Sequence, residues 1–275
     1  MKNTLEQFKL DGEVAIITGG AGLLGIRHAE AILDGGAKAV LFDIHQPSLD
    51  AALATLQKSY GKNVWGFVVD ITKEKEIELA VEKIEKEIGP ISILINNAAN
   101  NPKVEDGTKN FSRLENFPLE MWQKDIAVGL TGAYLMDKVV GTRMARRKKG
   151  VLLHIASDFG LIAPDQRIYR NEKLSEENQP VKPVTYSAVK HGLIGLSKYM
   201  ATYWAEKGIR SNSVAFGGVA NNQPEEFVKK LTHLIPLGRM AKPDEYKATV
   251  LYLCSNASSY MTGATLVIEG GRTAW

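Results

Sequence analysis

Short apolar runs rich in valine and isoleucine alternate with amphipathic helical patterns, and this alternation constrains the fold more than any other feature of the chain. The runs cover residues 14–18, 39–43, 64–70, 91–96, 151–157, 210–215 and 265–269. Each run is typical of a strand buried on both faces. Ile77, Val81, Ile84 and Ile88 show the helical spacing that gives one apolar stripe. The alternation predicts an α/β fold, a doubly wound parallel sheet of about seven strands with helices on both faces.

The chain is long enough for one large core. It has 275 residues, of which 44% are hydrophobic and 24% charged. We expect a single domain over residues 1–275. Three stretches break the rhythm of strands and helices, at about 100–118, 164–183 and 220–240. Ligands of such folds bind beyond the carboxyl ends of the strands, and long loops in a compact domain are usually functional. The three stretches are therefore predicted to be substrate-side insertions.

Charge and hydropathy argue against several classes of partner. The net charge of +3, spread over scattered basic residues, does not favour nucleic acid. No segment reaches the roughly 18 apolar residues that span a bilayer, and the first residues lack a cleavage pattern. Cys254 is the single cysteine and lies in an apolar stretch, which predicts a buried small hydrophobe. We expect a cytoplasmic protein that acts on a small-molecule substrate, with no nucleic-acid, membrane or metal partner.

A glycine-rich turn follows the first predicted strand. Gly20, Gly22 and Gly25 match G-x-G-x-x-G between a strand and a helix. Glycine lets the backbone approach a pyrophosphate, which then lies at the N-terminus of the helix. An ordinary turn is the alternative reading. The setting favours a Rossmann-type dinucleotide site, and the residues expected around the cofactor are Gly19, Gly20, Gly22, Leu24 and Gly25.

Asp43 ends the second predicted strand and bears on the choice of cofactor. It lies 18 residues beyond Gly25. This is close to the offset of about 20 at which an acid accepts hydrogen bonds from the adenosine ribose hydroxyls. A carboxylate there would repel a 2′-phosphate, so the sequence predicts NAD rather than NADP. The alternative is an aspartate that only forms a turn.

Tyr186 and Lys190 are four residues apart, which places both side chains on one face of a helix. A phenol has a pKa near 10 and exchanges protons poorly at neutral pH, but a neighbouring ammonium group favours the phenolate and lowers that pKa. The pair is therefore a candidate for acid–base catalysis. Taken alone, a surface or packing role is the commoner reading of this spacing.

Taken together, these motifs resemble the short-chain dehydrogenase/reductase family, from Thr18 to the closing Gly271. The segment Val68-Val69-Asp70-Ile71-Thr72 resembles the end of the family's third strand. The resemblance implies that Asp70 contacts the adenine amino group and that Ile71 flanks the ring. Asn96-Asn97-Ala98-Ala99 resembles the family's Asn-Asn-Ala-Gly. By this resemblance Asn97, Ala98 and Ala99 stabilise the sheet and lie along the cofactor.

The same resemblance assigns the catalytic roles. Tyr186 is the proton donor or acceptor for the substrate oxygen, and Lys190 lowers its pKa and binds the nicotinamide ribose. Ser157, at the end of the fifth predicted strand, hydrogen-bonds the same substrate oxygen. Phe216-Gly217-Gly218-Val219 resembles the segment that holds the nicotinamide carboxamide. This places Gly217 and Val219 at the cofactor, with backbone bonds from Val219.

Three features depart from the family pattern. Gly129 replaces the usual asparagine of the fourth helix, which holds a water in the proton relay. The glycine spacing T-G-x-x-G-x-x-G resembles that of the family's extended sugar-nucleotide epimerases and dehydratases. The interval from Ser157 to Tyr186 is longer than in short members because residues 163–183 are inserted. Within this insertion Arg167, Tyr169, Arg170 and Lys173 are candidates to bind an anionic or hydroxylated substrate. A charged surface loop or a subunit contact is the alternative.

The expected function is reversible alcohol–carbonyl chemistry with NAD(H) on a small polar substrate. A sugar, sugar phosphate or polyol is the first expectation. It rests on the polar insertion and on a resemblance to bacterial members linked to surface sugars and flagellin modification. The family resemblance also implies a homotetramer or homodimer. Two alternatives stay open, a sugar-nucleotide epimerase or dehydratase and a catalytically quiet NAD-binding sensor or scaffold.

Overall fold

The computed structural model describes residues 3–100 and 112–275 and contains one parallel sheet. Its strand order is β3-β2-β1-β4-β5-β6-β7. In this doubly wound order, successive strands are added on one side of β1 up to β3 and then on the other side from β4 onward. The strands are β1 (Val14–Thr18), β2 (Lys38–Asp43), β3 (Val64–Val68), β4 (Ile93–Asn96), β5 (Gly150–Ser157), β6 (Ile209–Phe216) and β7 (Thr265–Ile268). The predicted Rossmann-type α/β fold with seven strands is confirmed.

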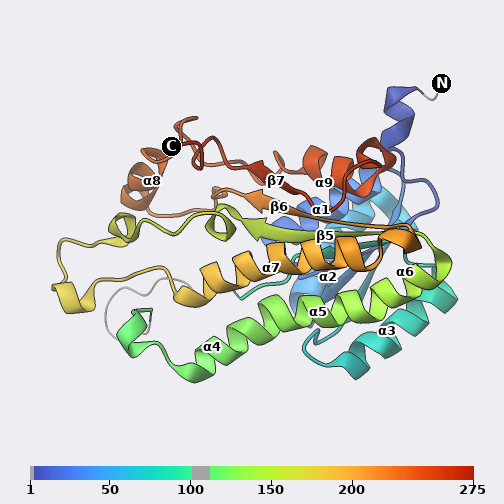
Figure 1. Ribbon diagram of the computed structural model, residues 1–275, viewed down its shortest axis with the longest axis horizontal. Helices are drawn as coiled ribbons and strands as arrows, with labels where there is room; N and C mark the ends of the chain where they lie inside the picture. The colour runs from blue at the N-terminus through green and yellow to red at the C-terminus, as the bar shows by residue number, and fades with distance from the viewer. Residues whose placement is uncertain (1–2, 101–111) are drawn as a thin grey trace.

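Helices cover both faces of the sheet (Figure 1). They are α1 (Leu23–Asp34), α2 (Gln46–Tyr60), α3 (Glu74–Glu87), α4 (Leu119–Ile126), α5 (Gly132–Met136), α6 (Thr142–Arg147), α7 (Val184–Tyr203), α8 (Glu225–Thr232) and α9 (Lys247–Cys254). Alternate residues of β1 point into different cores. Ala15 and Ile17 pack with α1, α2 and α9, whereas Val14 and Ile16 pack with α3, α6 and the end of α7.

The edges of the sheet correct one expectation. All seven strands were expected to be buried on both faces, but Val267 of β7 is 38% exposed and Val68 of β3 is 48% exposed. The reason is position, because β7 and β3 are the outermost strands of the sheet in this chain. The inner strands β1 and β4 are buried throughout, as predicted.

The topology brings the motif residues to one end of the sheet. The glycine turn follows β1, Asp43 ends β2, Asn97 follows β4, Ser157 ends β5 and Gly217 follows β6. Because all strands are parallel, these segments meet at the same carboxyl edge. Among the described residues, no helix combines the length and the apolar composition that crossing a membrane requires.

One long helical stretch runs beside α7, formed by α4, α5 and α6 in succession (Figure 1). Two π-helical segments join these helices, Ala127–Thr131 and Asp137–Gly141. A π-helical turn accommodates an extra residue and is frequent at functional sites. The first segment contains Gly129, which faces Val189 of α7.

Candidate active site

The glycine turn lies tightly against the neighbouring strands. Gly19 has a φ of +60°, and a Cβ there would lie 3.0 Å from the Ala98 Cα. A Cβ on Gly20 would lie 2.8 Å from the Leu41 Cβ. A Cβ on Gly25 would collide with the Gly19 carbonyl oxygen and lie 2.8 Å from the Gly20 Cα. The turn therefore has no room for side chains at these positions, as a cradle for a pyrophosphate requires. It leads directly into α1, whose N-cap is Gly22.

Asn97 and Thr18 hold this turn to β4. The Asn97 Nδ2 donates to the carbonyl oxygens of Thr18 and Gly19, at 2.9 and 3.2 Å. The backbone N–H groups of Asn97 and Ala98 both donate to the Thr18 Oγ1 at 3.0 Å. His28 of α1 is fully buried close by. Burial lowers the pKa of His28 to about 3, although the Asn97 amide opposes the shift. The ring is therefore neutral at physiological pH.

Asp43 lies beside the glycine turn. Its Oδ2 accepts a hydrogen bond from the Ala21 N–H at 3.1 Å, and its Oδ1 accepts one from the His45 N–H at 3.1 Å. The carboxylate thus stands where the turn and the end of β2 meet. Each carboxylate oxygen can accept further hydrogen bonds, so these contacts leave acceptor capacity toward a ribose.

Asp70 and Ile71 follow β3. The Asp70 Oδ1 accepts hydrogen bonds from the Thr72 N–H and Oγ1, at 3.0 and 2.6 Å. These contacts fix the carboxylate at the end of the strand. Ile71 is mostly buried, and a Cβ on Gly132 would lie 2.8 Å from its Cδ1. Ile71 therefore packs against the helical stretch α4–α6.

Tyr186 and Lys190 lie on the first turns of α7. The Lys190 Nζ donates to the Ile155 carbonyl oxygen at 2.7 Å and lies 5.7 Å from the centre of the Tyr186 ring. Burial, followed by the charge of Lys182, lowers the pKa of Lys190 to about 8. Burial also raises the pKa of Tyr186; the Ser157 hydroxyl opposes this rise and the Asp158 charge adds to it. In the chain alone, the phenol pKa is thus raised, not lowered as the Tyr–Lys spacing suggests, because burial dominates.

The sequence reasoning missed three groups near Ser157 and Tyr186. The Ser157 Oγ donates to the Asp158 Oδ1 at 2.7 Å, and the Asp158 Oδ2 in turn pairs with the Arg272 Nη1 at 2.8 Å. Lys182 is a third, and its Nζ lies 4.0 Å from the centre of the Tyr186 ring. Asp158 directly follows the serine, so its place in the sequence is a usable signal. Arg272 has no such signal, because it lies far away in the chain.

Gly129 and Val189 explain the departure from the family asparagine. A Cβ on Gly129 would lie 2.6 Å from the Val189 Cγ1, so any larger side chain would collide with α7. Beside them, the buried Thr185 Oγ1 donates to the Asp125 Oδ2 at 2.6 Å. A cavity of about 10 Å³, the size of one water molecule, lies here and is lined by Ala99, Asn100, Asp125, Gly129, Thr185, Tyr186, Val189 and Lys190.

Gly217 and Val219 follow β6. The Gly217 N–H donates to the Ile268 carbonyl oxygen at 3.0 Å, and a Cβ there would lie 2.8 Å from the Glu269 Cα. The Val219 carbonyl oxygen accepts from the Gln223 Nε2 at 2.8 Å. Because a carbonyl oxygen can accept a second hydrogen bond, this contact leaves the predicted backbone bonds from Val219 possible.

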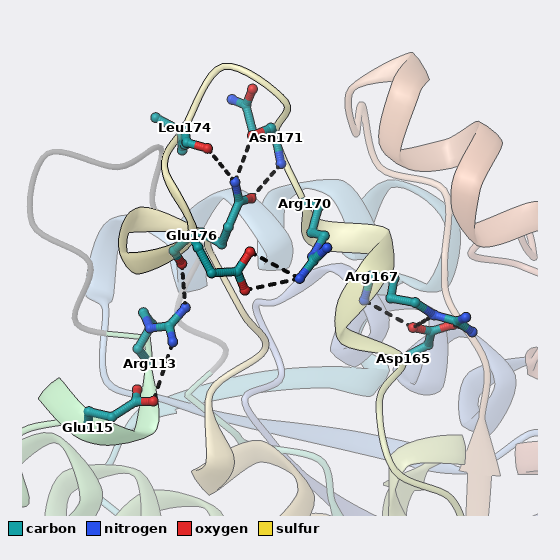
Figure 2. Close-up of polar contacts among 9 residues, drawn as sticks. Arg113, Glu115, Asp165, Arg167, Arg170, Asn171, Leu174 and Glu176 are labelled. Carbon is teal, nitrogen blue, oxygen red and sulfur yellow. Dashed lines mark hydrogen bonds and ion pairs between the residues drawn. The ribbon is translucent and has the colours of Figure 1, made fainter.

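The insertion 164–183 is held by ion pairs within itself and by contacts with its neighbours (Figure 2). Arg167 pairs with Asp165 at 2.7 Å, and Arg170 pairs with Glu176 at 3.0 Å. The Arg113 Nη1 donates to the Glu176 carbonyl oxygen at 2.9 Å, which joins the described end of the insertion 100–118 to this loop. Residues 101–111 of that insertion lie outside the described residues.

The third insertion, 220–240, contains α8 and packs against the second. The Tyr169 and Phe227 rings lie 5.5 Å apart, and Ile168 and Leu231 are buried in the same small cluster. Of the four candidate substrate-binding residues of the loop, Arg167 and Arg170 are engaged by carboxylates and Tyr169 packs against α8. The geometry therefore favours a structured loop rather than a cluster of unengaged cations.

Comparison with known proteins extends over almost the whole chain. The sequence profile of a family described as enoyl-(acyl carrier protein) reductase matches residues 21–273. D-threitol dehydrogenase of Mycolicibacterium smegmatis is 32% identical, covering 97% of this chain and 95% of that protein. The NAD-dependent glycerol dehydrogenase of Listeria innocua is 31% identical, covering 98% of this chain and 96% of that protein.

Similarity to a solved structure also extends over almost the whole chain. The gluconate 5-dehydrogenase of Burkholderia cenocepacia, in complex with NADP and tartrate, has a TM-score of 0.85 and 25% identity to this chain. The alignment covers 99% of this chain and 100% of that one. The similarity thus includes both the glycine turn and the segments that carry Ser157, Tyr186 and Lys190.

Proposed function

Because this chain belongs to the short-chain dehydrogenase/reductase family, we propose that it is an NAD(H)-dependent dehydrogenase that interconverts an alcohol and a carbonyl on a small polyol or sugar-like substrate. One observation carries the proposal. Ser157 at the end of β5 and the Tyr186–Lys190 pair of α7 gather at the carboxyl edge of the sheet, the same edge that carries the glycine turn, in which Gly19, Gly20 and Gly25 leave no room for a Cβ.

The residues present fit a dinucleotide. The turn formed by Gly19, Gly20, Gly22, Leu24 and Gly25 would hold the pyrophosphate at the N-terminus of α1. Asp70 and Ile71 would bind the adenine side. Asn97, Ala98 and Ala99 would lie along the cofactor, and Gly217 and Val219 would hold the carboxamide. The bound nicotinamide supplies the hydride acceptor or donor.

The chain's own residues would handle the proton and the substrate oxygen. In the oxidising direction, Tyr186 takes the proton of the substrate hydroxyl on its phenolate oxygen, and Ser157 hydrogen-bonds the same substrate oxygen. Lys190 stabilises the phenolate while it is itself protonated. Because the pKa of Lys190 is about 8, this cation is present through the neutral range.

NAD is preferred over NADP in this proposal. Asp43 hydrogen-bonds to the glycine turn, and a carboxylate there disfavours a 2′-phosphate. Residues 19–25 contain no lysine or arginine that would neutralise such a phosphate. Relatives of both kinds exist, since one is named as NAD-dependent and one solved relative holds NADP.

A polyol is the substrate class that the relatives favour. The names of the three relatives contain threitol, glycerol and gluconate. These compounds share adjacent hydroxyl groups on a short carbon chain. The loop 164–183 and α8 would form the substrate side of a single domain over residues 1–275. Its polar groups suit a hydroxylated ligand.

A cytoplasmic homotetramer or homodimer completes the proposal. Tyr199 and Tyr203 of α7 stack with ring centres 5.6 Å apart, and each is more than half exposed. Exposed paired aromatic side chains on one helix face are typical of a contact with another subunit. The buried Cys254, the single cysteine of the sequence, suits a reducing compartment.

The test combines cofactor binding with turnover. NADH and NADPH are titrated against the purified protein, and threitol, glycerol, galactitol and gluconate are then screened for NADH formation. We expect tighter binding of NADH and turnover of at least one polyol. Tyr186→Phe should bind NADH as the wild type does and lose turnover by at least about 100-fold. Tight binding without any turnover would favour the sensor alternative, and turnover retained in Tyr186→Phe would refute the mechanism.

A further inference from the structure

A buried carboxylate controls the hydroxyl group of the catalytic serine. The Ser157 Oγ donates its single proton to the Asp158 Oδ1 at 2.7 Å, and the Phe159 N–H donates to the same oxygen at 2.9 Å. Asp158 is 3% exposed, so solvent does not compete for these contacts. With its proton directed to Asp158, the Ser157 Oγ presents lone pairs to its other neighbours.

One cation balances that carboxylate. The Arg272 Nη1 lies 2.8 Å from the Asp158 Oδ2, and the side chains of this pair are 5% and 4% exposed. The guanidinium carbon also lies 4.7 Å from the centre of the Phe159 ring. Phe159 in turn packs edge to face on Tyr186, with ring centres 6.0 Å apart. Arg272 thus reaches Ser157 through Asp158 and reaches Tyr186 through Phe159.

A tight turn at residues 269–273 positions Arg272. Gly270 and Gly271 have φ values of +74° and +91°, and a Cβ on Gly271 would lie 2.8 Å from the Pro236 Cγ. The Thr273 N–H and Oγ1 both donate to the Glu269 carboxylate at 3.2 Å and close the turn. The double glycine lets the chain turn sharply beside Pro236 and bring Arg272 to Asp158, which directly follows β5.

We infer that Arg272 and Asp158 are positioning residues for the proposed dehydrogenase chemistry, which hold the Ser157 hydroxyl and set the charge felt by the Tyr186 phenol. This inference rests on the proposed function. Asp158 alone would place an uncompensated negative charge beside Tyr186 and make its phenolate harder to form. Arg272 offsets part of that charge. The C-terminal turn therefore acts on the acid–base group through Asp158 and Phe159.

Several other groups surround Tyr186 and belong to the same electrostatic balance. They are Lys190 on its own helix, Lys182 above its ring, Tyr169 of the insertion, and the Asp125–Thr185 pair at the adjoining cavity. The Asp158 charge opposes the lowering of the Lys182 pKa by burial, and the charges of Arg272 and Asp158 act in opposite directions on the pKa of Tyr169. Changes to this pair therefore also reach Lys182 and Tyr169, and the titration of Tyr186 itself is the readout that decides.

The test uses charge changes with opposite expected signs. Arg272→Met leaves Asp158 uncompensated and should raise the pKa of Tyr186 by about one unit. Asp158→Asn leaves Arg272 uncompensated and should lower it. The Tyr186 titration is read from tyrosinate absorbance as the difference between each variant and the same variant carrying Tyr186→Phe. Arg272→Lys, which keeps the charge, should stay close to the wild type.

The kinetic readout should follow the titration. The acid limb of kcat/KM for polyol oxidation should move to higher pH in Arg272→Met and to lower pH in Asp158→Asn. The double variant Asp158→Asn/Arg272→Met should return close to the wild-type limb, which also shows that the single changes do not act by unfolding. Shifts in the same direction, or a change in melting temperature with no shift, would overturn the inference. If the wild type oxidises no polyol, the proposed function fails while the absorbance titration still decides this inference.

Discussion

The proposed cofactor half and the proposed substrate half of the site are built in different ways. Around β1 and β4, the structure relies on the backbone: glycines without room for a side chain, and Asn97 bonded to carbonyl oxygens of the turn. Around the insertion 164–183 and the C-terminal turn, it relies on paired side chains. Examples are Arg170 with Glu176 and Arg272 with Asp158.

The difference shows which part of the site is general and which is particular. A backbone cradle recognises a pyrophosphate that all dinucleotides share, and its geometry tolerates little change. Paired side chains, in contrast, can be replaced by other residues without a change in the backbone. The substrate half is therefore the part in which this chain can differ from its relatives in specificity.

The strictest test of the cofactor half is Gly25→Ala. The added Cβ would collide with the Gly19 carbonyl oxygen, so the turn must open. We expect NADH affinity to fall by at least about 100-fold, or about 3 kcal/mol, in a fluorescence titration. The matched control is Gly195→Ala on the exposed face of α7, where a Cβ would meet nothing within 4 Å. It should leave affinity unchanged and gain up to about 1 kcal/mol of stability. Equal NADH affinity in the two variants would remove the distinction between the halves.

Gly129→Asn tests whether the departure from the family asparagine is steric. Because a Cβ at this position would lie 2.6 Å from the Val189 Cγ1, the variant should lose about 1–3 kcal/mol in denaturant unfolding. The double variant Gly129→Asn/Val189→Ala should recover most of that loss. Recovery would show that positions 129 and 189 form one packing unit. A single variant as stable as the wild type would contradict this account.

Asp43→Ala tests the preference for NADH over NADPH. Removal of the carboxylate should reduce the preference for NADH over NADPH by about tenfold, or about 1.4 kcal/mol, through weaker NADH and stronger NADPH binding. Asp50→Ala is the control, because Asp50 lies in α2 and accepts its hydrogen bond from Gln46 rather than from the glycine turn. An unchanged ratio of the two dissociation constants would mean that Asp43 does not face the ribose.

The smallest effect is expected from Arg170→Gln in the insertion. Arg170 and Glu176 are both exposed, and such ion pairs contribute about 0–1 kcal/mol. Stability should change by less than about 1 kcal/mol, and kcat should stay near the wild-type value. A large rise in KM for the polyol with unchanged stability would instead assign Arg170 to substrate binding.

The sequence predicts the local parts of this molecule and misses the distant ones. The strands, the glycine turn and the Tyr186–Lys190 pair depend on residues close in the chain, whose spacing already carries the geometry. Strand β7 differs from expectation because an apolar run does not reveal that it lies at an edge. The partnership of Asp158 with Arg272 joins residues that only the tertiary fold brings together. The raised pKa of Tyr186 likewise depends on burial by surrounding elements, which no spacing encodes.

His28 gives the dinucleotide cradle a vulnerability to acid that has nothing to do with turnover. Its pKa lies at about 3 in the folded chain, against an ordinary value of 6.5, so the unfolded chain takes up this proton first as the pH falls. The associated stability is intact above pH 6.5 and declines as the pH falls toward 3. Because His28 lies beneath the turn that Asn97 anchors, acidification should undermine the nucleotide-binding platform itself. Since Lys190 has a pKa of about 8 and the pKa of Tyr186 is raised above its ordinary value, both catalytic groups are already protonated when this loss of stability begins.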